Sequence, residues 1–119
     1  MRDVPLKEIV DVLYQAHVGT LYVEGANPRH GHEWRVFEQH PLPSDKQLIA
    51  GVIDTVTNFV EHPDLVAQRI ERYVSVVGAD RFMAGTDCGF GTIARTQPRV
   101  HPTIAWAKLE SLVEGARRV

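Results

Sequence analysis

The stretch Met83-Ala-Gly-Thr-Asp-Cys-Gly-Phe-Gly91 decides the fold of this chain. A short apolar run ends there in an acid, the only cysteine and two glycines. This pattern predicts a buried strand that runs into a Gly-rich loop, with Asp87 and Cys88 at the carboxyl end of the strand. In α/β proteins, binding and catalytic residues collect at that end. A lone cysteine can equally be a small apolar core residue, so both interpretations of Cys88 stay open on this pattern alone.

Two earlier apolar runs end in the same way, one at Glu24 and one at Asp54. The acids Glu24, Asp54 and Asp87 are 30 and 33 residues apart (54−24 and 87−54), which is about the length of one βα unit. Strands joined by helical crossovers are parallel, and right-handed crossovers place their carboxyl ends on one edge. We therefore expect these three acids and Cys88 to line a single rim.

Helical patterns occupy the segments around these strands. The spacing of apolar residues predicts helices from Pro5 to about His17, from Pro63 to Gly78, and from Pro102 onward. On the last helix Trp106 is expected at an edge. The predicted inner face of that helix consists of Ala105, Leu109, Leu112, Val113 and Ala116. The sequence thus predicts an α/β fold of parallel βα units, with residues 1–119 forming one partial domain.

Smaller features complete this outline. The segment from His32 to about Glu38 is expected to form two helical turns that place Trp34 and Phe37 over the core. Histidines precede the two prolines that open the second and third helices, and we expect these histidines to cap them.

Composition narrows the classes of function. With 13 basic and 15 acidic residues among 119, nothing indicates a surface for nucleic acid or for an anionic membrane. No apolar run is long enough to span a bilayer, and the N-terminus lacks the apolar segment of a signal peptide. A single cysteine cannot form an internal disulfide. These features predict a cytoplasmic protein without membrane or nucleic-acid partners.

Three parallel strands with helices for one face would leave the other face and both sheet edges open to water. We infer from this that the chain is an incomplete part of a larger closed architecture, for which three of the eight units of a (β/α)₈ TIM barrel are the natural candidate. Either the missing barrel portion or a second copy would cover the open surfaces, and a self-associated dimer is the expectation for the chain alone.

Four stretches resemble the C-terminal catalytic barrel of cobalamin-independent methionine synthase and its shorter relatives, among them the zinc-dependent epoxyalkane:coenzyme M transferases. They are Leu21-Tyr-Val-Glu24, Gly51-Val-Ile-Asp54-Thr55, Glu61-His-Pro-Asp-Leu-Val66 and Gly85-Thr-Asp-Cys-Gly-Phe-Gly91. In order and spacing they resemble the last three βα units of that family. The resemblance therefore covers nearly the whole chain but only a part of the family's catalytic domain.

The resemblance implies a zinc ion held by Glu24, by Cys88 and by a His-x-Cys pair on the preceding strand. Zinc accepts these donor types, and a catalytic site keeps a coordination position for substrate. A thiol bound there would lose its proton and attack a methyl or alkyl donor. In methionine synthases the thiol is homocysteine and the donor is 5-methyltetrahydropteroyl-glutamate. No His-x-Cys pair precedes Glu24 in this sequence, so two of the four implied ligands are absent.

Other polar residues allow more than one interpretation. His30 and His32 are either loop residues or additional metal ligands, and Asp54 either contacts substrate or caps the following loop through Thr55 and Thr57. Asp87 would point away from a metal held by Cys88 if the backbone stays extended, which favours a structural role.

In methionine synthases a histidine implicated as proton donor follows the acid that Asp54 resembles, and this chain has Val56 there. That departure leaves room for a relative with another thiol substrate. The first hypothesis is thus the C-terminal part of a zinc-dependent thiol alkyltransferase, as a truncated gene product or one half of a split enzyme. The alternatives are a non-catalytic remnant or interaction module without metal, and a metal hydrolase using Glu24, His30, His32 and Cys88.

Overall fold

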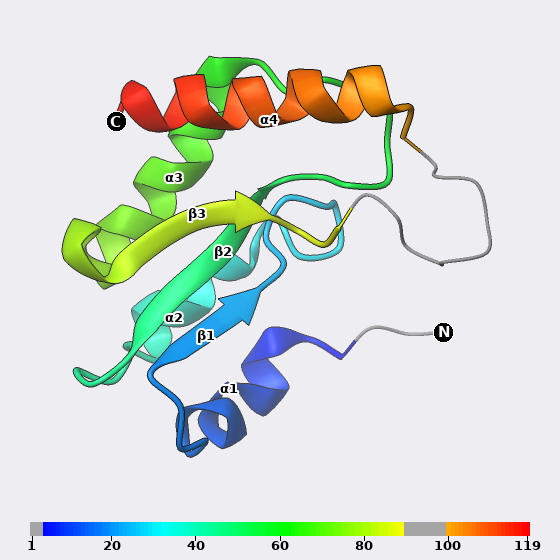
Figure 1. The fold of residues 1–119 in the computed structure, drawn as a ribbon. Coiled ribbons are helices and arrows are strands. Elements are labelled where there is room, and N and C mark those ends of the chain that lie inside the picture. Colours follow the sequence, from blue (N-terminus) through cyan, green and yellow to red (C-terminus); the bar gives the residue numbers. More distant parts are fainter. Residues whose placement is uncertain (1–3, 90–99) are drawn as a thin grey trace.

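The computed structural model describes residues 4–89 and 100–119, so Phe90 and Gly91 of the expected glycine loop lie outside the described residues. Figure 1 shows the arrangement of the elements. They are, in chain order, α1 (Leu6–Tyr14), β1 (Thr20–Val23), η1 (Glu33–Arg35), α2 (Val36–Gln39), β2 (Gln47–Ile53), α3 (Pro63–Val77), η2 (Ala79–Arg81), β3 (Phe82–Thr86) and α4 (Pro102–Arg117). None of the helices described is both long and apolar enough to cross a bilayer.

The three strands form one parallel sheet in the order β1-β2-β3. Leu21 pairs with Leu48 across the first ladder, and Ala50 pairs with Ala84 across the second. A register shift between Gly51 and Ile53 interrupts the second ladder near the carboxyl ends of the strands. These pairings confirm the predicted α/β fold of parallel βα units, and the sheet they form is open rather than closed.

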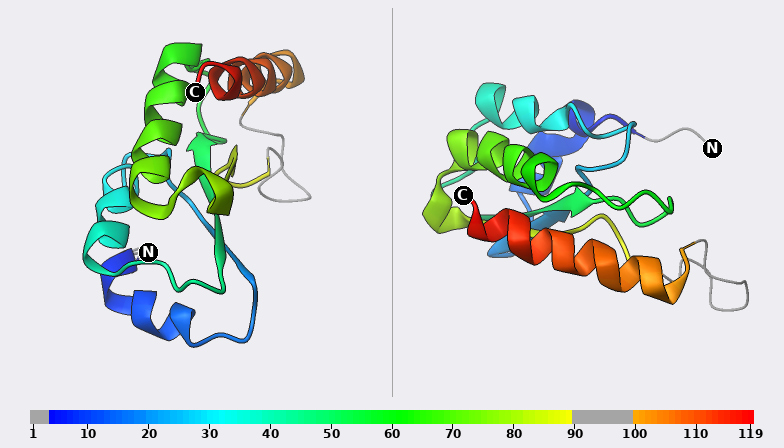
Figure 2. Two further views of the ribbon diagram at one scale, coloured as in Figure 1. Left: turned by 90° about the vertical axis from the view of Figure 1, so that its left-hand side faces the viewer. Right: turned by 90° about the horizontal axis from the view of Figure 1, so that it is seen from above.

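Helices α2 and α3 lie on one face of this sheet, as the left view of Figure 2 shows. Side chains from that face and from the helices form the core, in which Leu48 and Ala50 are fully buried. The ring of Tyr73 on α3 stacks on Phe82 at 5.2 Å between centroids, and Phe37 of α2 lies 6.3 Å from Tyr73. The predicted position of Phe37 over the core is therefore confirmed.

The opposite face of the sheet is exposed. Tyr22 and Met83, which point to this face from β1 and β3, are 53% and 62% exposed. The Tyr22 hydroxyl reaches across the sheet and donates a hydrogen bond to the Thr86 carbonyl. It passes over Gly85, where a Cβ atom would lie 2.9 Å from the Tyr22 hydroxyl oxygen. An apolar face of this kind is what a part of a closed barrel would present.

Helix α4 corrects one prediction. Its buried residues are Lys108, Ser111 and Gly115, whereas Val113 from the predicted inner face is 51% exposed and Trp106 is 68% exposed. The fully buried Lys108 ammonium donates to Glu61 Oε1 at 2.9 Å, and the Ser111 hydroxyl donates to the Glu61 carbonyl oxygen. Leu112 of the predicted face does pack against the buried cluster of β2 and α3 side chains. The prediction was therefore wrong in part, because apolar spacing does not reveal a helix face that docks through a buried ion pair.

Helix α1 is shorter than predicted, since it ends at Tyr14 rather than near His17. The Lys46 ammonium donates to the carbonyl oxygens of Ala16 and Val18, at 2.8 and 2.7 Å, and holds the chain in a turn after the helix.

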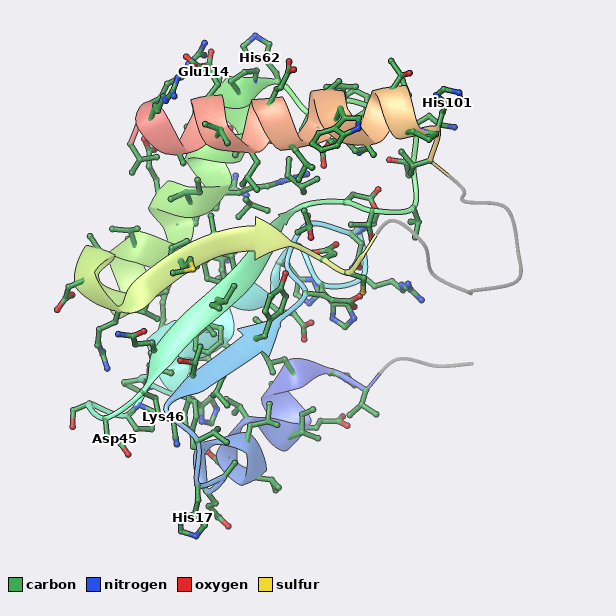
Figure 3. All side chains as sticks on the ribbon, viewed as in Figure 1. His17, Asp45, Lys46, His62, His101 and Glu114 are labelled. Carbon is green, nitrogen blue, oxygen red and sulfur yellow. The ribbon has the colours of Figure 1, made fainter. Side chains whose placement is uncertain are left out.

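Two histidines cap helices as predicted. Figure 3 shows His62 and His101 at the starts of α3 and α4. His62 Nδ1 accepts a hydrogen bond from the Asp64 amide at 3.0 Å, and His101 Nδ1 accepts one from the Thr103 amide at 3.1 Å. Both histidines thus satisfy amides that have no partner within their own helix.

The buried ion pair gives a first prediction. Replacing Lys108 by Met should lower the free energy of unfolding by about 3 kcal/mol, because the buried Glu61 carboxylate loses its closest cation. Urea unfolding followed by circular dichroism measures this. The double variant Lys108→Met, Glu61→Gln should regain part of the loss, since the buried Glu61 carboxylate is then no longer left without Lys108. Lys7→Met, at an exposed lysine, is the matched control. Equal stability of Lys108→Met and wild type would contradict the pair's role.

Helix contact at Gly115 gives a second prediction. A Cβ atom there would lie 2.5 Å from the Val66 side chain and 2.9 Å from the Pro63 carbonyl oxygen. Gly115→Ala should therefore destabilise the protein by about 1–3 kcal/mol through overpacking, despite alanine's helix propensity advantage of about 1 kcal/mol. In Gly19→Ala the new Cβ meets nothing within 4 Å, so that variant is the control. A more stable Gly115→Ala protein in thermal unfolding would refute the close contact.

Candidate functional site

The thiol of Cys88 contacts the carboxylate of Glu24. Cys88 Sγ donates a hydrogen bond to Glu24 Oε1 at 2.9 Å, although the two residues are 64 positions apart in the chain. Glu24 directly follows β1, and Cys88 lies two positions after the end of β3. The parallel sheet places the carboxyl ends of these strands on one edge, as the spacing of the acids predicted. The structure therefore brings together the two predicted metal ligands, whose ligand role stays a prediction.

Asp87 fixes the loop that follows β1. Its carboxylate is buried and accepts hydrogen bonds from the amides of Gly25, Ala26 and Asn27, each at 2.9 Å. The Asn27 side-chain amide donates a fourth bond at 3.0 Å. With four donors, the Asp87 oxygens are fully engaged inside the protein. This confirms the structural role expected for Asp87, which secures the backbone immediately after Glu24.

His30 approaches the other oxygen of Glu24. Its Nε2 atom lies 3.6 Å from Glu24 Oε2, and its Nδ1 atom contacts Glu33 Oε1. Glu33 is buried, and its Oε2 atom accepts the amide of Leu6 at 2.5 Å. His32 instead is exposed and lines a surface groove whose lining includes neither Glu24 nor Cys88. Of the two histidines considered as ligands, only His30 is therefore brought to the site.

Asp54 caps the loop after β2. Its Oδ1 atom accepts the Val56 amide at 3.0 Å, and its Oδ2 atom accepts the Thr57 hydroxyl at 2.8 Å. Asp54 thus caps the loop as one of the two interpretations predicted, and it contacts Thr57 as expected. Its second contact is with the Val56 amide and not with Thr55. The Asp54 amide donates to Glu61 Oε2 at 2.7 Å. A role of Asp54 toward substrate stays a prediction.

The surroundings of Cys88 favour the neutral thiol. The hydrogen bond to Glu24 raises the pKa of the Cys88 thiol to about 11, and partial burial and the negative charges of Glu24 and Asp87 act in the same direction. At neutral pH the sulfur therefore keeps its proton and shares it with the carboxylate. A cation placed between the two groups would reverse this preference, because it stabilises thiolate and carboxylate alike.

The residues present match a zinc site in donor type but supply only part of it. A carboxylate oxygen and a thiolate sulfur on one tetrahedral zinc lie about 3.6 Å apart, which a small widening of the 2.9 Å contact would reach. Within residues 4–89 and 100–119, however, no three His, Cys, Asp or Glu side chains are grouped so as to hold a metal ion. The described chain thus offers two ligands, and a complete site needs others.

Sequence reasoning missed two buried glutamates next to the site. Glu33 anchors His30, and Glu61 holds the Asp54 amide while pairing with Lys108. Glu61 belongs to a stretch that carries the family resemblance, which was an available signal. Nothing in the local pattern around Glu33 distinguishes it from a surface residue of a short amphipathic turn.

Comparison with known proteins places these features in a family. The family model "Cobalamin-independent synthase, Catalytic domain" matches residues 4–117. A 2-hydroxypropyl-CoM lyase from Xanthobacter autotrophicus is 37% identical over 113 residues, which are 93% of this chain and 28% of that protein. A methionine synthase from Methanothermobacter marburgensis is 33% identical over 72 residues, or 60% of this chain and 21% of that protein.

A solved structure shares the fold. It is a B12-independent methionine synthase from Shewanella in complex with selenomethionine, with a TM-score of 0.74 and 21% sequence identity. The match covers 94% of this chain and 29% of that one. The chain thus spans less than a third of each of these three relatives. The predicted resemblance is confirmed, and the chain belongs to the family of the cobalamin-independent synthase catalytic domain.

Proposed function

We propose that this chain supplies one carboxylate and one thiolate to the zinc site of an enzyme that transfers a methyl or alkyl group to a small-molecule thiol. The observation that carries the proposal is the contact of 2.9 Å between Glu24 and Cys88 across the carboxyl ends of β1 and β3. Membership of the family supports it, because the resemblance assigned ligand roles to the same two residues. A non-catalytic remnant would have no functional reason to keep them in contact.

Each residue of the site has a separate task. Zinc, when bound, supplies the charge that lowers the pKa of a thiol at its open coordination position. Cys88 Sγ must give up the proton that it shares with Glu24 Oε1 before either atom can serve as a ligand. Asp87 holds the backbone after Glu24 in place while this proton leaves. The buried loop cap at Asp54 keeps the neighbouring strand end fixed beside them.

The remaining ligands come, in this proposal, from another part of a complete barrel. The described residues provide two donors, and a catalytic zinc requires at least three from protein. A His-x-Cys pair on the strand beside β1 would supply them. That part would also cover the exposed face that carries Tyr22 and Met83. Activity therefore belongs to the assembled barrel, which we place in the cytoplasm, and the chain alone is expected to self-associate.

For the thiol, the coenzyme M type is the first candidate. The 2-hydroxypropyl-CoM lyase is 37% identical over 93% of this chain. The methionine synthase is 33% identical over 60% of it. Val56 also stands where methionine synthases carry their histidine, and its amide is engaged by Asp54. Methionine biosynthesis from homocysteine and a methyltetrahydropteroyl-glutamate is the second candidate. The hydrolase hypothesis loses support, because among the described residues Glu24, His30, His32 and Cys88 are not grouped so as to hold a metal ion.

The raised thiol pKa gives a prediction for the chain without metal. Glu24→Gln removes the charge that disfavours the thiolate, so the pKa of Cys88 should fall from about 11 toward its ordinary value. A fall of the thiol pKa by about one to two units raises the fraction of Cys88 present as thiolate. A thiolate of lower pKa is also a weaker nucleophile, which offsets part of this gain. Alkylation of Cys88 by iodoacetamide at pH 8 should become about three- to tenfold faster. Mass spectrometry over time measures the rate.

Glu38→Gln, which changes an exposed glutamate of α2, is the matched control and should react at the wild-type rate. Identical rates for wild type and Glu24→Gln would show that the two side chains do not interact in solution.

The function itself is tested with the complementary barrel portion of a full-length relative. Co-expression should give a complex that binds about one zinc per barrel and alkylates the thiol of coenzyme M or homocysteine. Cys88→Ala and Glu24→Gln should each lower activity by more than about a hundredfold, since loss of a supporting contact alone costs about 10–100-fold. Ser75→Ala, at an exposed position of α3, is the control. A zinc-free complex, or a loss below about tenfold, would rule out the proposed role.

A further inference from the structure

We infer that His30 and Glu33 are positioning residues, which hold the side chain of Glu24 so that one of its oxygens faces Cys88. The inference rests on the proposed function, because it assigns a role toward the same pair of ligands. It adds two residues for which the resemblance implied no such role. The segment that contains them, between β1 and α2, follows Glu24 directly in the chain.

Four groups form a continuous chain of contacts from the thiol into the protein. Cys88 Sγ lies 2.9 Å from Glu24 Oε1, while Glu24 Oε2 lies 3.6 Å from His30 Nε2. The other ring nitrogen of His30 contacts Glu33 Oε1. The imidazole thus bridges two carboxylates, one of which faces the thiol. Each oxygen of Glu24 has a different neighbour, and this difference defines the orientation of its carboxylate.

Glu33 is the fixed end of this chain of contacts. It is buried, and its Oε2 atom accepts the amide of Leu6 at 2.5 Å. Leu6 is the first residue of α1, where the helix leaves amides without an internal partner. Glu33 itself opens η1, so its side chain joins two elements. A buried carboxylate needs such partners, and with them it provides a rigid support for His30.

Glu24 needs a support of this kind. Its side chain is 36% exposed, and a long side chain at such a position samples several rotamers. Asp87 restrains the backbone after Glu24 but makes no hydrogen bond to its carboxylate in the described structure. Besides the hydrogen bond from Cys88 itself, the approach of His30 at 3.6 Å is the contact of the Glu24 carboxylate that supports the rotamer directed at Cys88. Residues that orient metal-binding side chains in this way commonly change metal affinity by about 10–100-fold.

Cadmium binding to the full chain tests the inference without any enzymatic assay. Cd²⁺ binds thiolate sulfur, and the sulfur-to-cadmium charge-transfer absorbance in the ultraviolet reports on Cys88, the only cysteine. Wild type should show this absorbance, and Cys88→Ala should lack it. Glu33→Gln and His30→Gln should each lower the Cd²⁺ affinity by about tenfold or more. His32→Gln, at an exposed position before η1, and Glu38→Gln, at an exposed position of α2, are matched controls and should bind as wild type does.

The outcomes separate the inference from the proposed function. If wild type shows no sulfur-to-cadmium absorbance, Glu24 and Cys88 do not act as a ligand pair in this chain and the inference is overturned, while the proposed function, which places the complete site in the assembled barrel, is decided by the co-expression test. If wild type binds and both Glu33→Gln and His30→Gln bind equally well, the positioning role is overturned while the proposed function stands. Circular dichroism and the urea midpoint establish that each variant is folded during the titration. Should Glu33→Gln unfold, the His30→Gln variant decides, because the Leu6 amide of α1 is held by Glu33.

Discussion

The buried carboxylate of Asp87 is the interaction on which the rest of the site depends. It belongs to the segment after β3, yet all four of its hydrogen-bond donors lie in the loop after β1. The intervening strand joins this arrangement, because the Asp87 amide donates to the Ile53 carbonyl at 2.9 Å. A single residue thus connects the carboxyl ends of all three strands, through its carboxylate to the loop after β1 and through its backbone amide to β2. Glu24 and Cys88, which flank these contacts in sequence, are held close together as a consequence.

A second buried network supports the middle strand from the helical side. Glu61 receives the Asp54 amide and the ammonium of Lys108, and Arg69 lies 3.5 Å from the same carboxylate. Helix α4 therefore docks through buried polar contacts to Glu61 beside the apolar contact of Leu112. Replacing a whole buried ion pair by apolar residues often changes the free energy of unfolding little, whereas removing one partner alone lowers it strongly. Such a network fixes the place of α4 more than it adds to the free energy of unfolding.

Local patterns in the sequence predicted much of this architecture. The spacing of Glu24, Asp54 and Asp87 indicated parallel strands with a common rim, and Pro63 and Pro102 marked the starts of two helices that the structure confirms. The face of α4 was predicted only in part, because a fully buried Lys108 resembles a surface residue until its partner Glu61 is known. The same limit applies to Glu33, whose role depends on Leu6 and His30. Long-range polar partners cannot be recognised from the periodicity of one segment.

The central claim is that Glu24 and Cys88 hold the same cation. X-ray absorption spectroscopy of the zinc-loaded chain tests it most directly, since sulfur and oxygen ligands differ in distance and in scattering. The claim predicts one sulfur at about 2.3 Å and at least one oxygen at about 2.0–2.2 Å, with the sulfur lost in Cys88→Ala and an oxygen lost in Glu24→Ala. A zinc shell of oxygen and nitrogen alone, unchanged in both variants, would contradict it.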